Sequence, residues 1–268
     1  MRFSIIVLLM ISGLFILSCS SDGPTSPGDN GEEAQPPAFS YQPDLTITIP
    51  EEFPSEDYYS EDIEYQEEIV TAYPLEQFVP VDFTAEVILD DPADIRPLYA
   101  YHVTASDFDP RDRSHIVSDI HWLDFSTGYY LPDPIDRVYF AELTSAYNVR
   151  GPEVINLYRK IDVIAGEEEP VMFETEAMES ISLVYNDEPV QAIPLTDFIS
   201  DYITTTPESY HYRLIDLSAG QYEFSWEELG AGYYLPGADL TIFLTTETTS
   251  LLNNPEISQL NSIELYEN

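Results

Sequence analysis

Apolar and polar residues alternate in the first patterned segment of the chain, DLTITIP at 44–50, where leucine and isoleucine alternate with threonine. A period of two gathers the apolar side chains on one face of an extended strand. Short runs of this kind, separated by proline and glycine, recur as far as the C-terminus. The only helices expected are short ones around WLDF (122–125) and WEEL (226–229). The pattern therefore predicts a β-rich α+β fold.

One pattern occurs twice, because HWLDFSTGYYLP at 121–132 has a counterpart, SWEELGAGYYLP, at 225–236. An ordered series of such matches predicts an internal duplication of a unit of roughly 100 residues, a period too long for a solenoid. We therefore expect two similar tandem domains, the first at 41–166 with an N-terminal extension and the second at 167–268. The other matched segments are IVTAYPLEQFV (69–79) with PVQAIPLTDFI (189–199), LYAYHVTAS (98–106) with YHYRLIDLS (210–218), RVYFAEL (137–143) with LTIFLTT (240–246), and PEVINLYRKIDVI (152–164) with PEISQLNSIELY (255–266).

The residues shared by the two copies are of types that pack in a core or form turns. One ring of each Tyr-Tyr pair is expected in the core and one at its edge. The glycine before each pair is expected to supply a positive φ for a turn. Polar matches are few, and neither histidine nor arginine recurs in register, so we predict no shared reactive group. The aromatic residues expected to form the repeat core are Trp122, Tyr129, Tyr130, Trp226, Tyr233 and Tyr234.

The charge of the chain is strongly negative. Fifty acidic residues face nine basic ones, which gives a net charge of −41. DNA, RNA and anionic lipid head groups should repel such a chain, so no nucleic-acid partner is expected. We interpret the acids as a solvated surface, with cation binding by clustered carboxylates and adaptation to a salty medium as the alternatives. With 44% apolar residues, the chain can still build buried cores.

The N-terminus has the pattern of a secretory signal. Arg2 precedes an apolar run, 4–17, that is too short for a comfortable membrane span. The run ends at Ile16-Leu17-Ser18-Cys19, which resembles the lipobox of bacterial lipoproteins, with isoleucine at the first position where leucine is commoner. The resemblance implies removal of 1–18 and acylation of Cys19, which would anchor the protein to a membrane through lipid. An ordinary signal peptide that contains a cysteine is the alternative.

Cys19 is the only cysteine of the chain. Once it is acylated, no thiol is left for a disulfide, a nucleophile or a metal ligand. The next residue is Ser20 rather than aspartate, which resembles the address of outer-membrane lipoproteins. Residues 19–40 are rich in serine, glycine, proline and acids, and they predict a disordered tether behind the lipidated cysteine. We therefore expect the protein in the cell envelope, anchored at the outer membrane.

The spacing of the histidines does not match a metal-binding motif. His115 and His121 lie six residues apart, a spacing that suits neither one helical face nor an i, i+2 pair on a strand. His211 stands alone, and His102 lies in a segment expected to be a strand. We interpret these residues as solvent-facing or partly buried histidines, with a zinc site as the alternative.

The acidic loop DFDPRDRSHIVSD at 107–119 resembles the start of a calcium-binding loop. Asp107 and Asp109 fit the first and third positions of an EF-hand, but the fifth, sixth and twelfth positions do not. Two interpretations stay open: an irregular calcium site formed by Asp107, Asp109 and Asp112, or a solvated loop whose arginines pair with nearby acids. No other cofactor is expected, because the chain has no glycine-rich phosphate loop. The chain also lacks the G-x-S-x-G motif that presents a serine nucleophile.

Each repeat, with Y-x-Y, a tryptophan, G-Y-Y-L-P and a closing pair of strands in that order, resembles the later half of the molybdopterin-binding domain of sulfite-oxidase-type enzymes. The resemblance implies a similar succession of strands. The metal-binding cysteine of that family has no counterpart here, so the resemblance implies no molybdenum chemistry.

Together these features predict a non-enzymatic, lipid-anchored cell-envelope protein. Its tandem domains would bind an envelope protein or a glycan, or serve a structural role. The alternative is a secreted hydrolase that acts on glycan or peptide through carboxylate or metal chemistry, because two suitably spaced acids are enough for glycoside hydrolysis.

Overall fold

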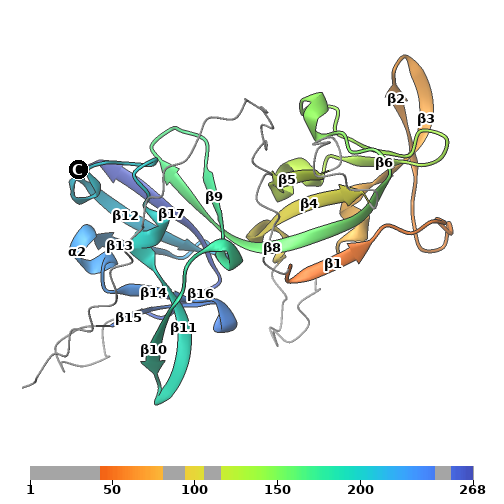
Figure 1. Cartoon of the computed structure of the whole chain (residues 1–268). Helices are drawn as coiled ribbons and strands as arrows, with labels where there is room; N and C mark the ends of the chain where they lie inside the picture. The colour runs from red at the N-terminus through yellow and green to blue at the C-terminus, as the bar shows by residue number, and fades with distance from the viewer. Residues whose placement is uncertain (1–42, 81–93, 106–115, 245–254, 268) are drawn as a thin grey trace, which may run out of the picture. The chain divides into compact units, whose positions relative to one another are not determined.

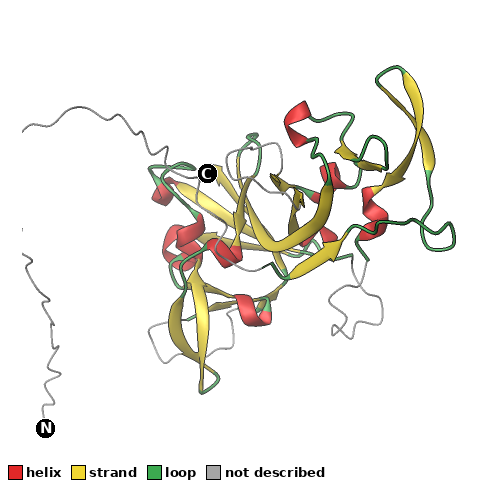
Figure 2. Cartoon of the chain, turned by 45° about the vertical axis from the view of Figure 1, so that its right-hand side comes forward, coloured by secondary structure: helices red, strands yellow, loops and turns green. Residues whose placement is uncertain are grey.

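Short strands joined by turns make up most of the fold, and the helices are only three or four residues long (Figure 2). The computed structural model describes residues 43–80, 94–105, 116–244 and 255–267, which belong to one unit of the chain, 36–268. The predicted β-rich α+β class is confirmed. Among these described residues, no helix has the length and apolar character needed to cross a membrane.

The first half of the described chain contains eight strands and one α-helix. The strands are β1 (Leu45–Thr48), β2 (Glu61–Tyr65), β3 (Glu68–Pro74), β4 (Tyr99–Ala105), β5 (Ile116–Ile120), β6 (Tyr129–Leu131), β7 (Arg137–Tyr139) and β8 (Pro152–Ala165). The helix is α1 (Trp122–Phe125), and 3-10 turns lie at η1 (Leu75–Phe78), η2 (Arg96–Leu98) and η4 (Ser145–Tyr147).

The second half contains β9 (Val171–Glu174), β10 (Ile181–Tyr185), β11 (Glu188–Pro194), β12 (Tyr210–Asp216), β13 (Gln221–Ser225), β14 (Gly232–Leu235), β15 (Leu240–Phe243), β16 (Ile257–Ser258) and β17 (Leu260–Glu267). Its helix is α2 (Trp226–Leu229), and its 3-10 turns are η5 (Thr175–Ala177), η6 (Leu195–Phe198), η7 (Pro207–Ser209) and η8 (Pro236–Ala238).

The two halves place their elements in the same order. In each half a hairpin (β2–β3 or β10–β11) is followed by 3-10 turns, a second hairpin (β4–β5 or β12–β13) and a short helix at the predicted residues. Two further paired strands (β6–β7 or β14–β15) precede a long final strand, β8 or β17. The common origin of the halves stays a prediction, because the order of elements describes topology and not descent.

Strand register corrects one part of the predicted alignment. In the first half Leu157 lies opposite Tyr101, and in the second half Leu265 lies opposite Tyr212. Pro152 therefore corresponds to Leu260 and not to Pro255, which the shared Pro-Glu dipeptide had suggested. The shared dipeptide was misleading, because two matching residues do not fix the position of a strand in its ladder.

Strand β8 belongs to both halves. Its N-terminal part pairs with β4 and β1, and its C-terminal part pairs with β9 and, in parallel, with β17. The resulting sheet has the strand order β13-β12-β17-β8-β4-β5, and Figure 1 shows β8 running from β1 and β4 toward β9 and β17. Two smaller sheets, β2-β3-β6-β7 and β10-β11-β14-β15-β16, complete the halves.

Each half has its own hydrophobic core, and β8 contributes to both. Ile155 and Leu157 pack in the first core, whereas Ile161 and Val163 pack in the second. These residues share one face of β8 because side chains alternate along a strand. Arg159 lies between the two pairs on that face, where it is buried.

The repeated glycines allow close packing. The predicted positive φ is wrong for both Gly128 and Gly232, since the described glycines with positive φ are Gly151 and Gly166. A Cβ on Gly128 would lie 2.3 Å from Phe140, and a Cβ on Gly232 would lie 2.5 Å from Leu195. The absent side chain therefore makes room for the core in each half.

The repeated tyrosines divide as predicted. The second tyrosine of each pair is buried (Tyr130 and Tyr234), and the first is half-buried (Tyr129 and Tyr233). The Tyr130 hydroxyl donates to Asp136, and the Tyr234 hydroxyl donates to Asp239, at 3.0 and 2.9 Å. Both aspartates have left-handed backbones, with φ of 45° and 46°. Asp136 and Asp239 thus hold corresponding turns, each of which follows a Tyr-Tyr-Leu-Pro segment.

The two tryptophans lie at the margins of the cores and are half-buried. Trp122 packs beside Tyr101, with ring centroids 5.5 Å apart, and Trp226 beside Tyr212 at 5.6 Å. The guanidinium of Arg96 lies over the Trp122 ring, 4.3 Å from its centroid.

Candidate functional site

The lipidation and calcium predictions lie outside the described residues. Cys19, Asp107, Asp109 and Asp112 fall in the ranges that the structure does not describe, as does His115. These predictions are therefore neither confirmed nor corrected.

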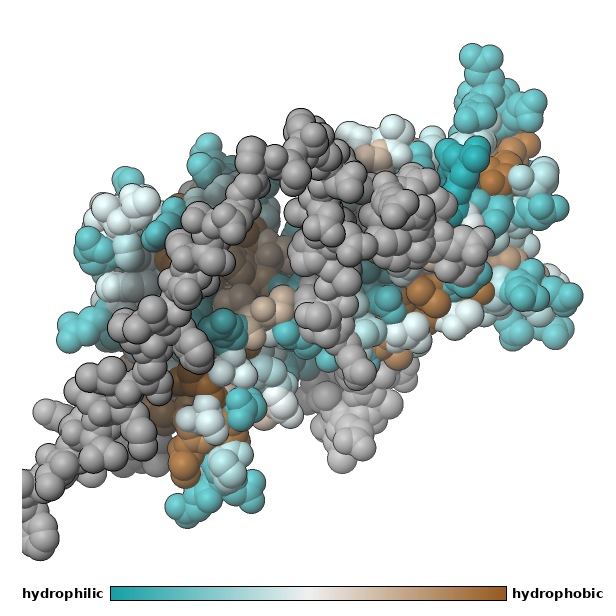
Figure 3. Space-filling view, in the orientation of Figure 1, coloured by the Kyte–Doolittle hydropathy of each residue, from teal (hydrophilic) through white to brown (hydrophobic). Residues whose placement is uncertain are grey.

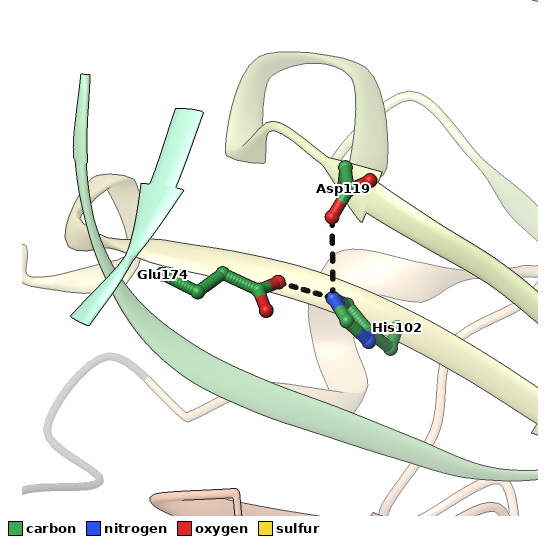
Figure 4. Close-up of side chains that lie close together, drawn as sticks. All are labelled: His102, Asp119 and Glu174. Carbon is green, nitrogen blue, oxygen red and sulfur yellow. Dashed lines mark hydrogen bonds and ion pairs between the residues drawn. The ribbon is translucent and has the colours of Figure 1, made fainter. Parts of the chain in front are cut away.

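A histidine and two carboxylates meet on the face of the large sheet opposite the cores (Figure 4). His102 comes from β4, Asp119 from the end of β5, and Glu174 from the end of β9. One ligand atom from each residue lies within 4.8 Å of the others. Both carboxylates approach the same atom, Nε2 of His102: Glu174 is hydrogen-bonded to it, and Asp119 Oδ1 lies 3.6 Å away.

Strand alternation explains the position of His102. Its neighbours Tyr101 and Val103 point into the first core, so the imidazole points to the other face. There it contacts Tyr158 of β8, with ring centroids 4.5 Å apart. His102 is only 2% exposed, and Glu174 is 8% exposed.

An irregularity in the sheet positions Asp119. Tyr101 pairs with Ile120 and Val103 with Val117, so two residues of β5 lie opposite the single residue His102. Asp119 has a φ of 60° at this β-bulge. Bulges of this kind redirect side chains, and they recur next to active sites. The Asp119 side chain is 64% exposed, so the cluster is open to solvent on this side.

The carboxylates govern the protonation of His102. Burial by itself lowers the pKa of this imidazole, but the hydrogen bond with Glu174 and the nearby carboxylate of Asp119 together outweigh burial and raise it above its ordinary value. The cluster therefore favours a positive charge at its centre, either a proton on the histidine or a cation.

A second charged group lies on the same face of β8. Lys160, the only lysine of the chain, is 2% exposed and forms an ion pair with Asp162. Nδ1 of His121 is 3.8 Å from the same aspartate. Burial lowers the pKa of Lys160 although Asp162 opposes the shift, and burial likewise lowers the pKa of His121.

On the opposite, core-facing side of β8, Arg159 joins the two halves. Its guanidinium donates to Asp239 of the second half at 3.0 Å and to the carbonyl oxygen of Leu98 in the first half at 3.2 Å. Its backbone amide donates to Asp44. Burial, together with the charge of Asp44, raises the pKa of nearby Glu176 to about 7. These contacts are structural, because the arginine is buried and fully engaged.

The corresponding place in the second half carries different residues. Strand register matches His102 with Arg213 and Asp119 with Glu223. Arg213 lies 3.4 Å from Glu223 and 3.3 Å from Glu264. No bulge interrupts the pairing of Arg213 with Glu223. The second half thus has a permanent guanidinium where the first half has an imidazole.

A pocket of about 610 Å³ lies elsewhere in the first half, beside the Tyr130–Asp136 hydrogen bond. Glu51, Asp133 and Glu153 also line it, together with Arg150. The pocket walls include none of the three residues of the cluster.

The cluster could hold a metal ion, because one imidazole nitrogen and two carboxylate oxygens form a common donor set for divalent ions. Sequence reasoning missed it. Glu174 comes from the other repeat, and the strand pairing that brings it to His102 leaves no motif in the sequence. The bulge at Asp119 has no sequence signal either.

The comparisons with known proteins add no further constraint. A scan of protein-family models, a search of curated proteins and a search of solved structures each found no match. The resemblances noted from the sequence therefore stay predictions.

Proposed function

We propose that the protein is a non-enzymatic, lipid-anchored component of the cell envelope, held at the outer membrane through acylated Cys19. The observation that carries this proposal is the segment Ile16-Leu17-Ser18-Cys19, which contains the only cysteine of the chain at the position a lipobox requires. Acyl chains contribute about 0.8 kcal/mol per buried CH₂, so two or more chains give a stable anchor.

The residues that recur in the two halves support a non-catalytic role. Gly128 and Gly232 admit core side chains, and Tyr130 and Tyr234 each bond to a turn aspartate. These are the interactions of a scaffold. We propose that an ancestral unit was duplicated and that both copies kept this scaffold.

The proposed partner is an envelope protein or a glycan. Both long hairpins expose aliphatic side chains: Ile69 on β3, and Ile181 and Val184 on β10. In Figure 3, brown apolar side chains lie among teal ones over these hairpins. Exposed apolar side chains next to strand edges suit partners that contact or extend a sheet.

Fractionation of cells that express the chain tests the anchor. Cys19→Ala should move the protein from the membrane fraction to the soluble envelope fraction. Ser20→Ala is the matched control and should leave the protein in the outer membrane. Retention of Cys19→Ala in the membrane after a salt wash would contradict a lipid anchor. Ser20→Asp should shift the protein to the inner membrane if the residue after Cys19 is the address.

A hydrolase is the second candidate, and the His102 cluster is the observation that favours it. A solvent-exposed carboxylate beside a histidine can activate water. The test is turnover of glycan and peptide substrates by the purified chain and by His102→Ala. The non-enzymatic proposal expects no turnover that depends on His102, and a rate lost in the variant would support the hydrolase instead.

A further inference from the structure

We propose that His102, Asp119 and Glu174 form a binding site for one divalent transition-metal ion of the zinc class, which links the two halves of the protein. This inference goes beyond the proposed function and does not depend on the lipid anchor. His102 and Asp119 belong to the first half and Glu174 to the second. An ion bound by all three would tie β4 and β5 to β9.

The convergence of two carboxylates on one nitrogen is the first argument. Nε2 of an imidazole carries at most one hydrogen, so it can donate to one carboxylate oxygen at a time. Yet oxygens of both Glu174 and Asp119 face this atom. A cation placed among the three would accept a lone pair from each ligand.

The spacing of the ligand atoms also suits a small ion. Zinc lies about 2.0–2.2 Å from nitrogen and oxygen ligands, which separates neighbouring tetrahedral ligands by about 3.4 Å. Nε2 of His102 and Oδ1 of Asp119 are 3.6 Å apart. Glu174 lies closer to the imidazole and would have to move back to admit an ion.

The donor set selects the class of ion. Calcium and magnesium prefer six or more oxygen ligands or octahedral shells with several waters. An imidazole nitrogen with two carboxylates suits zinc and its neighbours in the first transition row. The exposed side at Asp119 provides a route of entry and room for a water as fourth ligand.

Comparison of the halves supplies the second, independent argument. The bulge that redirects Asp119 occurs in the first half, and the matching pair Arg213–Glu223 lies in a regular ladder. The positive φ of Asp119 is a less favourable backbone conformation for a non-glycine residue, and it persists where surrounding interactions favour it. In the second half the guanidinium of Arg213 pairs with Glu223 and Glu264, whereas the first half carries an imidazole between two carboxylates.

The test uses the full chain, freed of metal with a chelator and kept at high salt so that the acidic surface binds cations weakly. Calorimetric titration with Zn²⁺ should show one saturable site per chain. Co²⁺ should then give visible d–d absorption typical of a nitrogen- and oxygen-ligated ion. At a free Zn²⁺ concentration 100 times Kd, the melting temperature should rise by about 5–10 °C.

Variants make the test specific. His102→Ala and Glu174→Gln should each weaken binding at least 10-fold and abolish the Co²⁺ spectrum. His211→Ala removes a histidine outside the cluster and should bind as the unaltered chain does. His102→Arg copies the second half; it should remain folded by circular dichroism and lose the site, which keeps the test valid if the alanine variant fails to fold.

Two outcomes would overturn the proposal. One is the absence of a saturable site, with only weak, salt-sensitive binding of several ions per chain. The other is a saturable site whose affinity is unchanged in His102→Arg and Glu174→Gln. Either result would leave the cluster as a buried ion pair, and neither would bear on membrane anchoring through Cys19.

Discussion

Replacement of Gly128 by alanine tests whether the repeated glycine is required for packing. The added Cβ would lie 2.3 Å from Cε1 of Phe140 and 2.7 Å from Cδ1 of Leu75. Both side chains are buried in the first core, so neither can swing into solvent. Overpacking of a core typically costs about 1–3 kcal/mol, and a clash with two buried side chains places the expected loss at about 2–3 kcal/mol.

Gly232→Ala makes the same test in the second half. There the Cβ would lie 2.5 Å from Cδ1 of Leu195 and 2.8 Å from Cε1 of Phe243. The slightly longer contacts predict a loss of about 2 kcal/mol. Gly237 is the matched control, because a Cβ at this position would meet no atom within 4 Å. Its replacement by alanine should therefore be neutral or stabilise the protein by up to about 1 kcal/mol.

Urea unfolding followed by tryptophan fluorescence measures these losses, and it reports on both halves because each contains one tryptophan, Trp122 or Trp226. Where alanine fits, Gly→Ala stabilises a protein by about 0.4–1 kcal/mol through the unfolded chain. A neutral or stabilising effect of Gly128→Ala and Gly232→Ala would therefore refute the packing argument.

Three further pairs of substitutions have calculable outcomes in the same urea assay. Tyr234→Phe should cost about 1.5–3 kcal/mol, because its partner Asp239 is half-buried. Tyr130→Phe should cost only about 0.5–1.5 kcal/mol, because its partner Asp136 is exposed and can turn to water. Equal losses would contradict this ranking. Arg159→Ala should cost about 3–5 kcal/mol because it leaves Asp239 without its buried partner. Arg159→Lys should restore little of the lost stability, because lysine lacks the planar guanidinium fork. Full stability in the lysine variant would contradict this role of the guanidinium. Trp122→Ala and Trp226→Ala should each cost roughly 2 kcal/mol, less than a fully buried tryptophan; losses above about 4 kcal/mol would place the rings in the core.

Much of the scaffold could be predicted from local sequence. The alternation in 44–50, the two short helices and the buried second tyrosine of each pair follow from period and residue type, which act within a few residues. The role of the glycines could not be predicted in the same way. Their contact with Phe140 or Phe243 depends on strands that pair across the sheet, so a turn requirement and a packing requirement look alike in sequence.

The His102–Asp119–Glu174 cluster could not be predicted, because the strand pairing that forms it leaves no pattern in the sequence. His102 was noted, but no pattern connected it with Glu174, 72 residues away in the other repeat. The shared strand β8 brings them together by pairing with β4 on one side and β9 on the other. The sequence also could not show that His102 and Arg213 occupy matching positions in the two halves. The two residue types differ, and only the strand register aligns them.

The most direct test of the account is mass spectrometry of the chain extracted from the membranes of cells that produce it. The account predicts a mature protein that begins at Cys19, with acyl chains on that residue and no peptide from 1–18. A mature protein with an unmodified Cys19, or one that begins elsewhere, would contradict the anchor on which the proposed function rests.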